Sequence, residues 1–199
     1  MLENEKDLLK KSKKGNIESF EQLISAYQKK VYNIALKIVG NHEDASEMAQ
    51  EVFIKVFKSI GQFKEESSFS TWIYRITTNV CLDEVRKSKN KIKMLSIDED
   101  LNVGEGEIKR QFYDSSRLPE ISAERNEMRK VLNQAILSLS FEHRIAVVMR
   151  DIQGFSYEEI AKTMKCPEGT VKSRINRARN ELREILKKNK ELFDIDYVK

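Results

Sequence analysis

Apolar residues recur at intervals of three and four along most of the chain, which is the spacing of one face of an α-helix. The strongest runs cover residues 20–38, 45–60 and about 70–86. Asn41 stands just before the second run as a candidate N-cap, and Gly61 follows that run as a candidate C-terminal end. With a short helix nearer the N-terminus, these runs predict a small all-α domain over residues 1–93.

The helical pattern stops in the middle of the chain. Residues 94–122 hold 3 Lys/Arg against 7 Asp/Glu, a charge of −4, and their Gly, Ser and Pro residues interrupt any sustained period. Such a segment is typical of a linker, with a short helical piece expected around residues 107–113. The sequence therefore predicts an all-α protein, with two small helical domains, 1–93 and 123–199, joined by a flexible acidic linker.

Capping signals divide the C-terminal domain into separate helices. Ser140 is a candidate N-cap, and Ser156 with Glu159 makes a capping box at the start of a short helix. Cys166–Pro167 then predicts a turn, because proline restricts the residue before it and suits the start of a new helix. The last helix is predicted over about 168–186. A capped helix, a tight turn and a second helix together indicate a helix-turn-helix.

The last helix has an apolar side and a polar side. Its apolar residues, at helical spacing, are Val171, Ile175, Ala178 and Leu182. Its opposite side carries Lys172, Ser173, Asn176 and Arg177. In a DNA-binding helix-turn-helix, residues placed in this way reach base edges in the major groove, where Lys or Arg can pair with guanine and Asn with adenine. Arg174, Arg179 and Arg183 are better placed for phosphates, whose contacts position the helix.

Charge along the chain is unevenly distributed. Residues 160–190 hold 10 Lys/Arg and 3 Asp/Glu, a charge of +7, and residues 71–93 hold 6 and 2, a charge of +4. Positive blocks of this kind are typical of proteins that bind a polyanion. The alternative for the last helix is an ordinary amphipathic helix with a solvated basic face. The capping box, the turn and the short preceding helix, all in frame, favour DNA binding.

Several other classes of function find no support in the sequence. It contains no P-loop, nucleophile elbow or Gly-rich dinucleotide loop, so no enzyme activity, cofactor or small-molecule substrate is expected. Cys81 and Cys166 lie far apart, and we interpret them as small buried hydrophobes that belong to no metal site. The N-terminus lacks the apolar region of a signal peptide, and no apolar run reaches the ~18 residues of a membrane span. We therefore expect a cytoplasmic protein.

Residues 155–183 resemble the DNA-binding domain of the extracytoplasmic-function (ECF) group of bacterial RNA polymerase sigma factors. The sequence that carries the resemblance is FSYEEIAKTMKCPEGTVKSRINRARNELR. Related GTVKxR helices also occur in response-regulator output domains. Such a regulator would carry a receiver domain of alternating strands and helices, which residues 1–120 do not show. A helical adaptor that binds only protein is disfavoured by the layout of Lys and Arg on the last helix. One departure is Lys165, because many helix-turn-helices place Gly in this turn, where positive φ is required.

Residues 44–60, DASEMAQEVFIKVFKSI, resemble the sigma-factor segment that binds the clamp coiled coil of core RNA polymerase. The apolar side of this helix faces its own domain, and an acidic side suits a basic partner helix. A solvated acidic helix face is the alternative from the residues alone. The resemblance implies core polymerase contacts at Asp44, Glu47, Gln50, Glu51 and Phe53.

Residues 63–89, FKEESSFSTWIYRITTNVCLDEVRKSK, resemble the sigma segment that melts and reads the −10 element. Opened DNA needs basic groups along its backbone and a pocket for an unstacked base. The resemblance implies −10 contacts at Lys64, Ser67, Ser68, Phe69, Arg75, Asn79, Arg86 and Lys87. It places the extruded base near the loop over 63–69 and Asn79, with Trp72 as structural support for that loop.

The two resemblances together imply a promoter reader with two parts. The last helix would read the −35 element through Lys172, Ser173, Arg174, Asn176, Arg177 and Arg179. The expected partners are core RNA polymerase, through its clamp coiled coil and its flap, together with promoter DNA and an anti-sigma factor. The acidic linker would lie in the RNA exit path. These two motif-bearing domains, in this order, are more specific than either motif alone.

Overall fold

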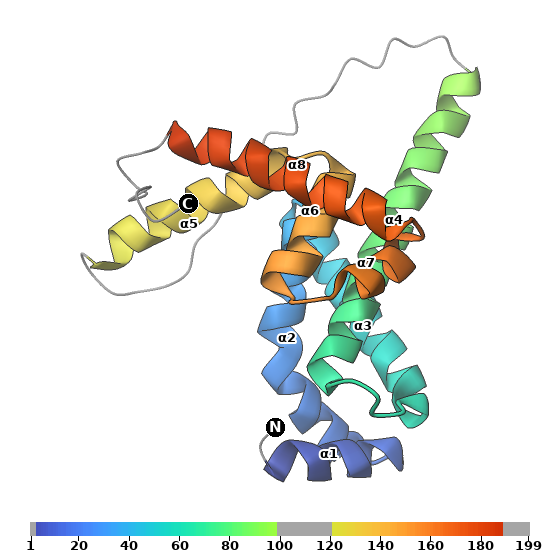
Figure 1. Ribbon diagram of the computed structural model, residues 1–199. Coiled ribbons are helices and arrows are strands. Elements are labelled where there is room, and N and C mark those ends of the chain that lie inside the picture. The colour runs from blue at the N-terminus through green and yellow to red at the C-terminus, as the bar shows by residue number, and fades with distance from the viewer. Residues whose placement is uncertain (1–2, 99–120, 189–199) are drawn as a thin grey trace. The chain divides into compact units, whose positions relative to one another are not determined.

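The computed structural model describes residues 3–98 and 121–188, with side chains for 5–87 and 127–188. Within these ranges the chain forms helices and no strands, as Figure 1 shows. The prediction of an all-α protein with two helical domains is confirmed. None of the described helices is long and apolar enough to cross a membrane.

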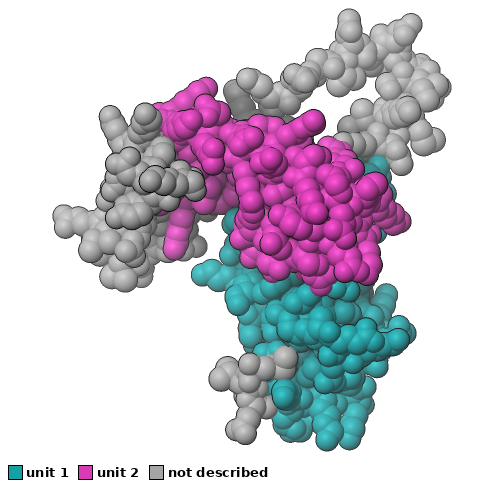
Figure 2. Space-filling view, viewed as in Figure 1, with its two compact units in different colours: residues 1–106 teal, residues 107–199 magenta. Residues whose placement is uncertain are grey.

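The chain divides into two compact units, Met1–Gly106 and Glu107–Lys199, which are coloured separately in Figure 2. The predicted domain boundaries, 1–93 and 123–199, remain a prediction. The short helical piece expected around 107–113 lies outside the described residues.

In its described residues, 3–98, unit 1 forms four α-helices and one short 3-10 helix. They are α1 (Glu3–Lys13), α2 (Ile17–Val39), α3 (His42–Ser59), η1 (Ile60–Gln62) and α4 (Phe69–Asp98). The predicted cap at Asn41 is confirmed, since its side chain accepts a hydrogen bond from the backbone N–H of Asp44 at 2.8 Å. Gly61 does not end the second helix directly but lies inside η1, which tightens the chain before the next loop.

Helix α2 is the centre of unit 1 and packs against α1, α3 and α4. The side chains that meet there are almost entirely apolar, and burial of such surface is the main stabilising term in folding. Fully buried members are Val31, Ala35, Ile38, Ala45, Val52, Val56, Phe69 and Ile73. The apolar spacing in the sequence therefore correctly predicted most of the buried faces of α2, α3 and α4, although Phe57 of the α3 run is 48% exposed.

Helix α4 is longer than the sequence pattern predicted. The prediction ended it near residue 86, but the helix continues to Asp98. Residues 87–98 contain no Gly or Pro, so no backbone signal ends the helix where its apolar spacing weakens. The predicted linker, residues 94–122, therefore begins inside a helix.

Over residues 121–188, the part of unit 2 that the structure describes, the chain forms four α-helices and one π-helical turn. They are α5 (Ile121–Ser138), α6 (Phe141–Val147), η2 (Val148–Ile152), α7 (Tyr157–Met164) and α8 (Glu168–Lys187). The caps predicted at Ser140 and Ser156 are both present, and the capping box of Ser156 and Glu159 is complete. The π-turn was not predicted, because one extra residue in a helical turn leaves no clear mark on apolar spacing.

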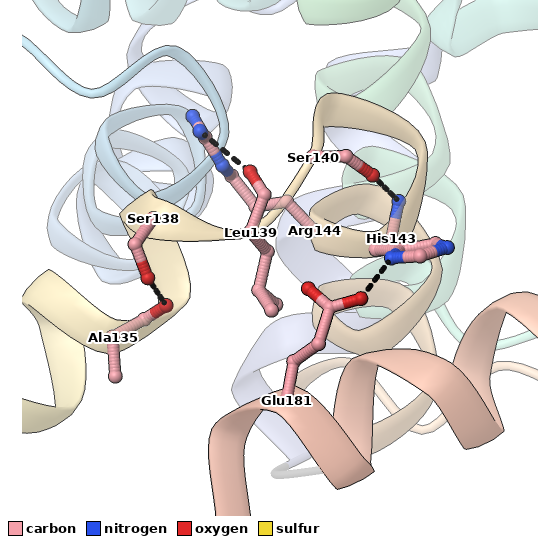
Figure 3. A network of polar contacts seen from close by, with 7 residues as sticks. All are labelled: Ala135, Ser138, Leu139, Ser140, His143, Arg144 and Glu181. Atoms are coloured by element: carbon pink, nitrogen blue, oxygen red, sulfur yellow. Dashed lines mark hydrogen bonds and ion pairs between the residues drawn. The ribbon is translucent and has the colours of Figure 1, made fainter. Parts of the chain in front are cut away.

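Helix α8 packs against α5, α6 and α7, and polar contacts fix the start of α6 beside it. Figure 3 shows the Ser140 hydroxyl accepting from the backbone N–H of His143, and the ring of His143 lying 2.9 Å from a carboxylate oxygen of Glu181 on α8. The Arg144 guanidinium donates to the backbone carbonyl oxygens of Leu137 and Leu139, at 2.5 and 3.1 Å. The chain between α5 and α6 is thus held by side chains as well as by packing.

Removal of the Ser156 hydroxyl should destabilise unit 2, because the backbone N–H of Glu159 at the start of α7 donates to it at 3.2 Å as one half of the capping box. Ser156→Ala is expected to lower the free energy of unfolding by about 1 kcal/mol, measured by urea denaturation. Ser173→Ala is the control, since that exposed hydroxyl donates only to the Thr170 carbonyl of its own helix. Equal losses in the two variants would contradict the importance of the cap.

Candidate nucleic-acid interface and acidic groove

Helices α7 and α8 meet through a tight turn, as the helix-turn-helix prediction requires. Lys165 ends α7 in the left-handed conformation, with φ 54° and ψ 50°, and the next N–H, that of Cys166, donates to the Ala161 carbonyl at 3.1 Å. Pro167 is the N-cap residue before α8, and its carbonyl accepts from the backbone N–H groups of Thr170 and Val171. Lys165 therefore adopts the backbone conformation that Gly provides in other helix-turn-helices.

The two sides of α8 differ as the sequence predicted. Val171, Ile175 and Ala178 are buried against the rest of unit 2. The side chains on the opposite side are exposed, and they are Lys172, Ser173, Asn176 and Arg177. A rigid helix thus presents four hydrogen-bonding side chains outward near its N-terminal end. Their contact with base edges stays a prediction.

The three arginines assigned to phosphates differ in the structure, and Arg183 is exposed. Arg174 is half-buried, and its guanidinium lies 3.8 Å from the sulfur of Cys166. Arg179 donates two hydrogen bonds to the carboxylate of Asp151, at 2.5 and 3.1 Å. These hydrogen bonds from Arg179 to Asp151 raise the pKa of the guanidinium still further. Arg179 therefore already has an anionic partner within its own unit.

A cluster that the sequence analysis missed surrounds Tyr157 at the start of α7. The guanidinium of Arg150 lies 4.7 Å from the centre of its ring, and the ammonium of Lys172 lies 5.6 Å from it. Cations at these distances are attracted by the aromatic face. Arg150 and Asp151 both belong to the π-turn, which brings one beside Tyr157 and the other beside Arg179. This turn therefore holds Arg179, which is expected at DNA, and contributes Arg150 to the ring that Lys172 also contacts.

In unit 1, aromatic side chains hold both ends of the loop over 63–69. The ring centres of Phe63 and Trp72 are 5.0 Å apart, those of Phe69 and Trp72 are 5.7 Å apart, and Tyr27 adds an edge contact to Phe69 at 5.3 Å. The interpretation of Trp72 as support for the loop is confirmed by these contacts. Phe69 is completely buried, so its assignment as a −10 DNA contact is wrong. It anchors the loop and cannot reach a base.

The polar residues of this loop have different surroundings. Ser68 accepts from the backbone N–H of Thr71 at 3.1 Å and shares its hydroxyl with Ser70 and Thr71, so it caps the start of α4. Lys64 is exposed and Ser67 is half-buried. Ser68 was predicted to contact DNA, but its hydroxyl already caps the N-terminus of α4.

Asn79 is exposed on α4 at the edge of a hollow of about 380 Å³. The hollow is lined by Lys55, Lys58, Ser59, Ile76, Asn79 and Val80. Two lysines, two apolar side chains and an amide that can donate and accept are suitable for an unstacked base on a charged backbone. Lys55 is also 3.5 Å from the Glu51 carboxylate. No residue of the loop over 63–69 lines this hollow, so the structure does not bring that loop and Asn79 together in it. Arg75 and Arg86 lie on the same side of α4 as Asn79, at helical spacing, whereas the lysines from α3 were not foreseen.

A second hollow, which we call the acidic groove, lies between α3 and α4 and has a volume of about 290 Å³. It brings together three of the predicted polymerase contacts, Glu47, Gln50 and Glu51. Helix α4 adds residues that the sequence analysis did not assign to this site, Asp83 and Glu84. Carboxylates from two helices thus converge on one side of unit 1, which suits a basic partner better than a single helix face does.

The remaining candidates lie beside or outside the acidic groove. Asp44 accepts from the Asn41 side-chain amide at 2.7 Å at the start of α3, and Phe53 is half-buried; neither lines the groove. Ile54 lines it and is 48% exposed, and no polar pattern could have singled it out. Lys87 also lines the groove, where its ammonium lies 3.6 Å from the Glu84 carboxylate. The structure therefore groups Lys87 with the acidic residues and not with Asn79.

Comparison with known proteins identifies the two units. Sigma-70 region 2 matches residues 23–91, and Sigma-70, region 4 matches residues 129–182. The ECF RNA polymerase sigma factor SigW of Bacillus subtilis is 34% identical over 183 residues, which cover 92% of this chain and 96% of that protein. The chain belongs to the ECF family of RNA polymerase sigma factors. It is therefore a transcription initiation factor, and the response-regulator alternative is excluded.

Other relatives agree with this assignment. The ECF RNA polymerase sigma factor SigE of Mycolicibacterium smegmatis is 39% identical over 173 residues, which cover 86% of this sigma factor and 63% of that longer protein. Among solved structures, the sigma factor RpoE of Bartonella quintana, in complex with the anti-sigma factor NepR, is 26% identical with a TM-score of 0.60. That alignment covers 85% of this chain and 98% of the RpoE chain.

Burial of Phe69 predicts a role in stability. Phe69→Ala is expected to lower the free energy of unfolding of the sigma factor by about 3–5 kcal/mol, because the large cavity left among aromatic rings cannot collapse fully. Thermal or urea unfolding measures the loss. Phe57→Ala is the matched control, since Phe57 is 48% exposed and makes an edge contact with Phe20. A loss for Phe69→Ala no larger than that for Phe57→Ala would contradict the anchoring role.

Proposed function

We propose that this sigma factor divides promoter recognition between its two units. Helix α8 reads the −35 duplex, and the loop over 63–69 with Asn79 captures an unstacked −10 base. The acidic groove docks on the clamp coiled coil of core RNA polymerase, and unit 2 docks on the flap. Division of this kind lets each contact be weak, because tethering raises the effective concentration of the second contact.

The observation that carries the proposal is the outward polar face of α8. Lys172, Asn176 and Arg177 are exposed on one side of a helix whose other side is buried, and a capped α7 with a tight turn holds it in place. Side chains so arranged match the groove-reading geometry of a helix-turn-helix. The carboxylates that line the acidic groove suit a basic partner, and this supports a separate role for unit 1 in docking on core polymerase.

We further propose that the sigma factor acts in the cytoplasm as a regulator without catalysis or a cofactor of its own. Core polymerase and promoter DNA are the partners that its two surfaces suit. An anti-sigma factor is a further partner, because a relative of the same fold was solved with one. The acidic linker contributes by occupying the RNA exit path.

The decisive experiment is run-off transcription with purified core polymerase on templates that carry candidate promoters. Specific initiation that depends on this sigma factor supports the proposal. Lack of binding to core polymerase, in a pull-down with the full chain, would overturn it. The two variants that follow separate the functions of the two units.

Arg177→Ala should weaken −35 recognition while sparing core binding. Loss of one bidentate contact to a base costs roughly 1–3 kcal/mol, or about 5- to 150-fold in discrimination between the preferred base pair and others. Competition between promoters with single −35 substitutions measures it. Arg183→Ala, an exposed arginine further along α8, is the control and should weaken all promoters equally. Unchanged selectivity in Arg177→Ala would show that α8 is not the reading helix.

Glu51→Ala should do the reverse, weakening the affinity for core polymerase while leaving −35 selectivity unchanged in the holoenzyme that still forms. We expect a loss of about 1 kcal/mol, the upper range for one partly exposed charge pair. Titration of labelled sigma factor with core polymerase measures it. Glu21→Ala, an exposed glutamate on α2, is the matched control. If both variants bind as the natural protein does, the acidic groove is not the docking site.

A further inference from the structure

Lys13, in the last turn of α1, reaches the loop over 63–69 from a distant part of the sequence. Its ammonium donates to the backbone carbonyl of Phe63 at 2.8 Å and to the carboxylate of Glu65 at 2.8 Å. The same ammonium lies 5.8 Å from the centre of the Phe63 ring. The Lys13 side chain is only 25% exposed, whereas that of Glu65 is 60% exposed. One lysine thus makes three contacts with two loop residues, two with Phe63 and one with Glu65.

The backbone at Glu65 explains why such a contact matters. Its φ is 61°, in the left-handed region that residues other than Gly rarely adopt. A conformation of this kind persists only where its surroundings hold it. Phe63 and Phe69 fix the two ends of the loop by burial, and the ion pair with Lys13 holds Glu65 between them.

Helix α1 is itself firmly attached, so Lys13 extends from a rigid support. Leu9 is buried, and the hydroxyl of Tyr27 on α2 donates to the carboxylate of Glu5 at 3.2 Å. Ser12, also buried, donates to the Leu8 carbonyl within the helix. Helix α1 also packs against η1, which leads directly into the loop.

We propose that Lys13 is a positioning residue for promoter opening, which holds the loop over 63–69 in the conformation that accepts an unstacked base. This inference rests on the proposed function of the loop. A preformed pocket binds more tightly than one that must order itself around its ligand. Lys13 also neutralises Glu65, whose unpaired carboxylate would repel the phosphates of the opened strand.

The test measures how well the holoenzyme distinguishes a complete −10 element from one lacking a base. Promoter forks carry an abasic residue at each −10 non-template position in turn. The ratio of affinities for complete and abasic DNA at the most sensitive position reports capture of the extruded base. General loss of folded protein lowers the active fraction of the preparation but leaves this ratio unchanged.

Lys13→Met keeps the length of the side chain and removes its charge. We expect the ratio to fall by about fivefold, the scale of ordering one long side chain on binding. Lys10→Met, an exposed lysine of the same helix, is the control and should leave the ratio unchanged. Lys13→Arg should restore most of it, because a guanidinium can still donate to both oxygens.

Two variants of Glu65 separate shape from charge and do not depend on the stability of Lys13→Met. Glu65→Gln keeps the bond from Lys13 to Phe63 and should reduce the ratio by less than Lys13→Met does. Glu65→Gly adopts positive φ freely, so in the Lys13→Met background it should recover part of the lost ratio.

The outcomes distinguish this inference from the proposed function on which it rests. If Asn79→Ala abolishes discrimination but Lys13→Met and Glu65→Gln leave it intact, the positioning role of Lys13 is wrong and the base pocket stands. If the natural protein does not discriminate abasic DNA at any position, both proposals are overturned. A fall in Lys10→Met equal to that in Lys13→Met also overturns the role of Lys13.

Discussion

The burial of Phe69 among aromatic rings is the contact on which the arrangement of unit 1 depends. Phe69 is the first residue of α4, and its ring lies against Tyr27 of α2, Phe63 and Trp72. Because aromatic side chains bury large areas in fixed geometry, this contact determines where α4 begins and how the preceding loop is closed. Because α4 begins at Phe69, the position of this ring also determines where the exposed Asn79 and the acidic side of α4 lie.

Most of the fold could be predicted from the sequence, because apolar spacing and capping residues are local signals. Asn41, Ser140 and Ser156 cap their helices as expected, since a cap needs only a side-chain oxygen a few residues from an N–H. The predicted end of α4, near residue 86, was wrong, because weakened apolar spacing does not end a helix that has no Gly or Pro. The π-turn was missed for a related reason, as it shifts the helical register by one residue only.

The candidate sites were predictable where one helix carries the whole pattern and not where two elements meet. The outward face of α8 could be read from spacing alone. The contributions of Asp83 and Glu84 to the acidic groove required the packing of α3 against α4. Phe69 was misassigned because an aromatic residue in a DNA-binding loop has the same sequence signal whether it stacks on a base or on its own core. Lys13 could not be linked to Glu65 without the fold, since nothing local relates them.

The pairing of Arg179 with Asp151 affects how the affinity of unit 2 for a nucleic acid would depend on salt concentration. Neutralising phosphates releases condensed counterions, so affinity depends on salt roughly in proportion to the number of cations engaged. An arginine already neutralised by its own protein contributes less to that release than an unpaired one. The number of basic residues on α8 therefore overestimates how strongly added salt would weaken nucleic-acid binding by unit 2.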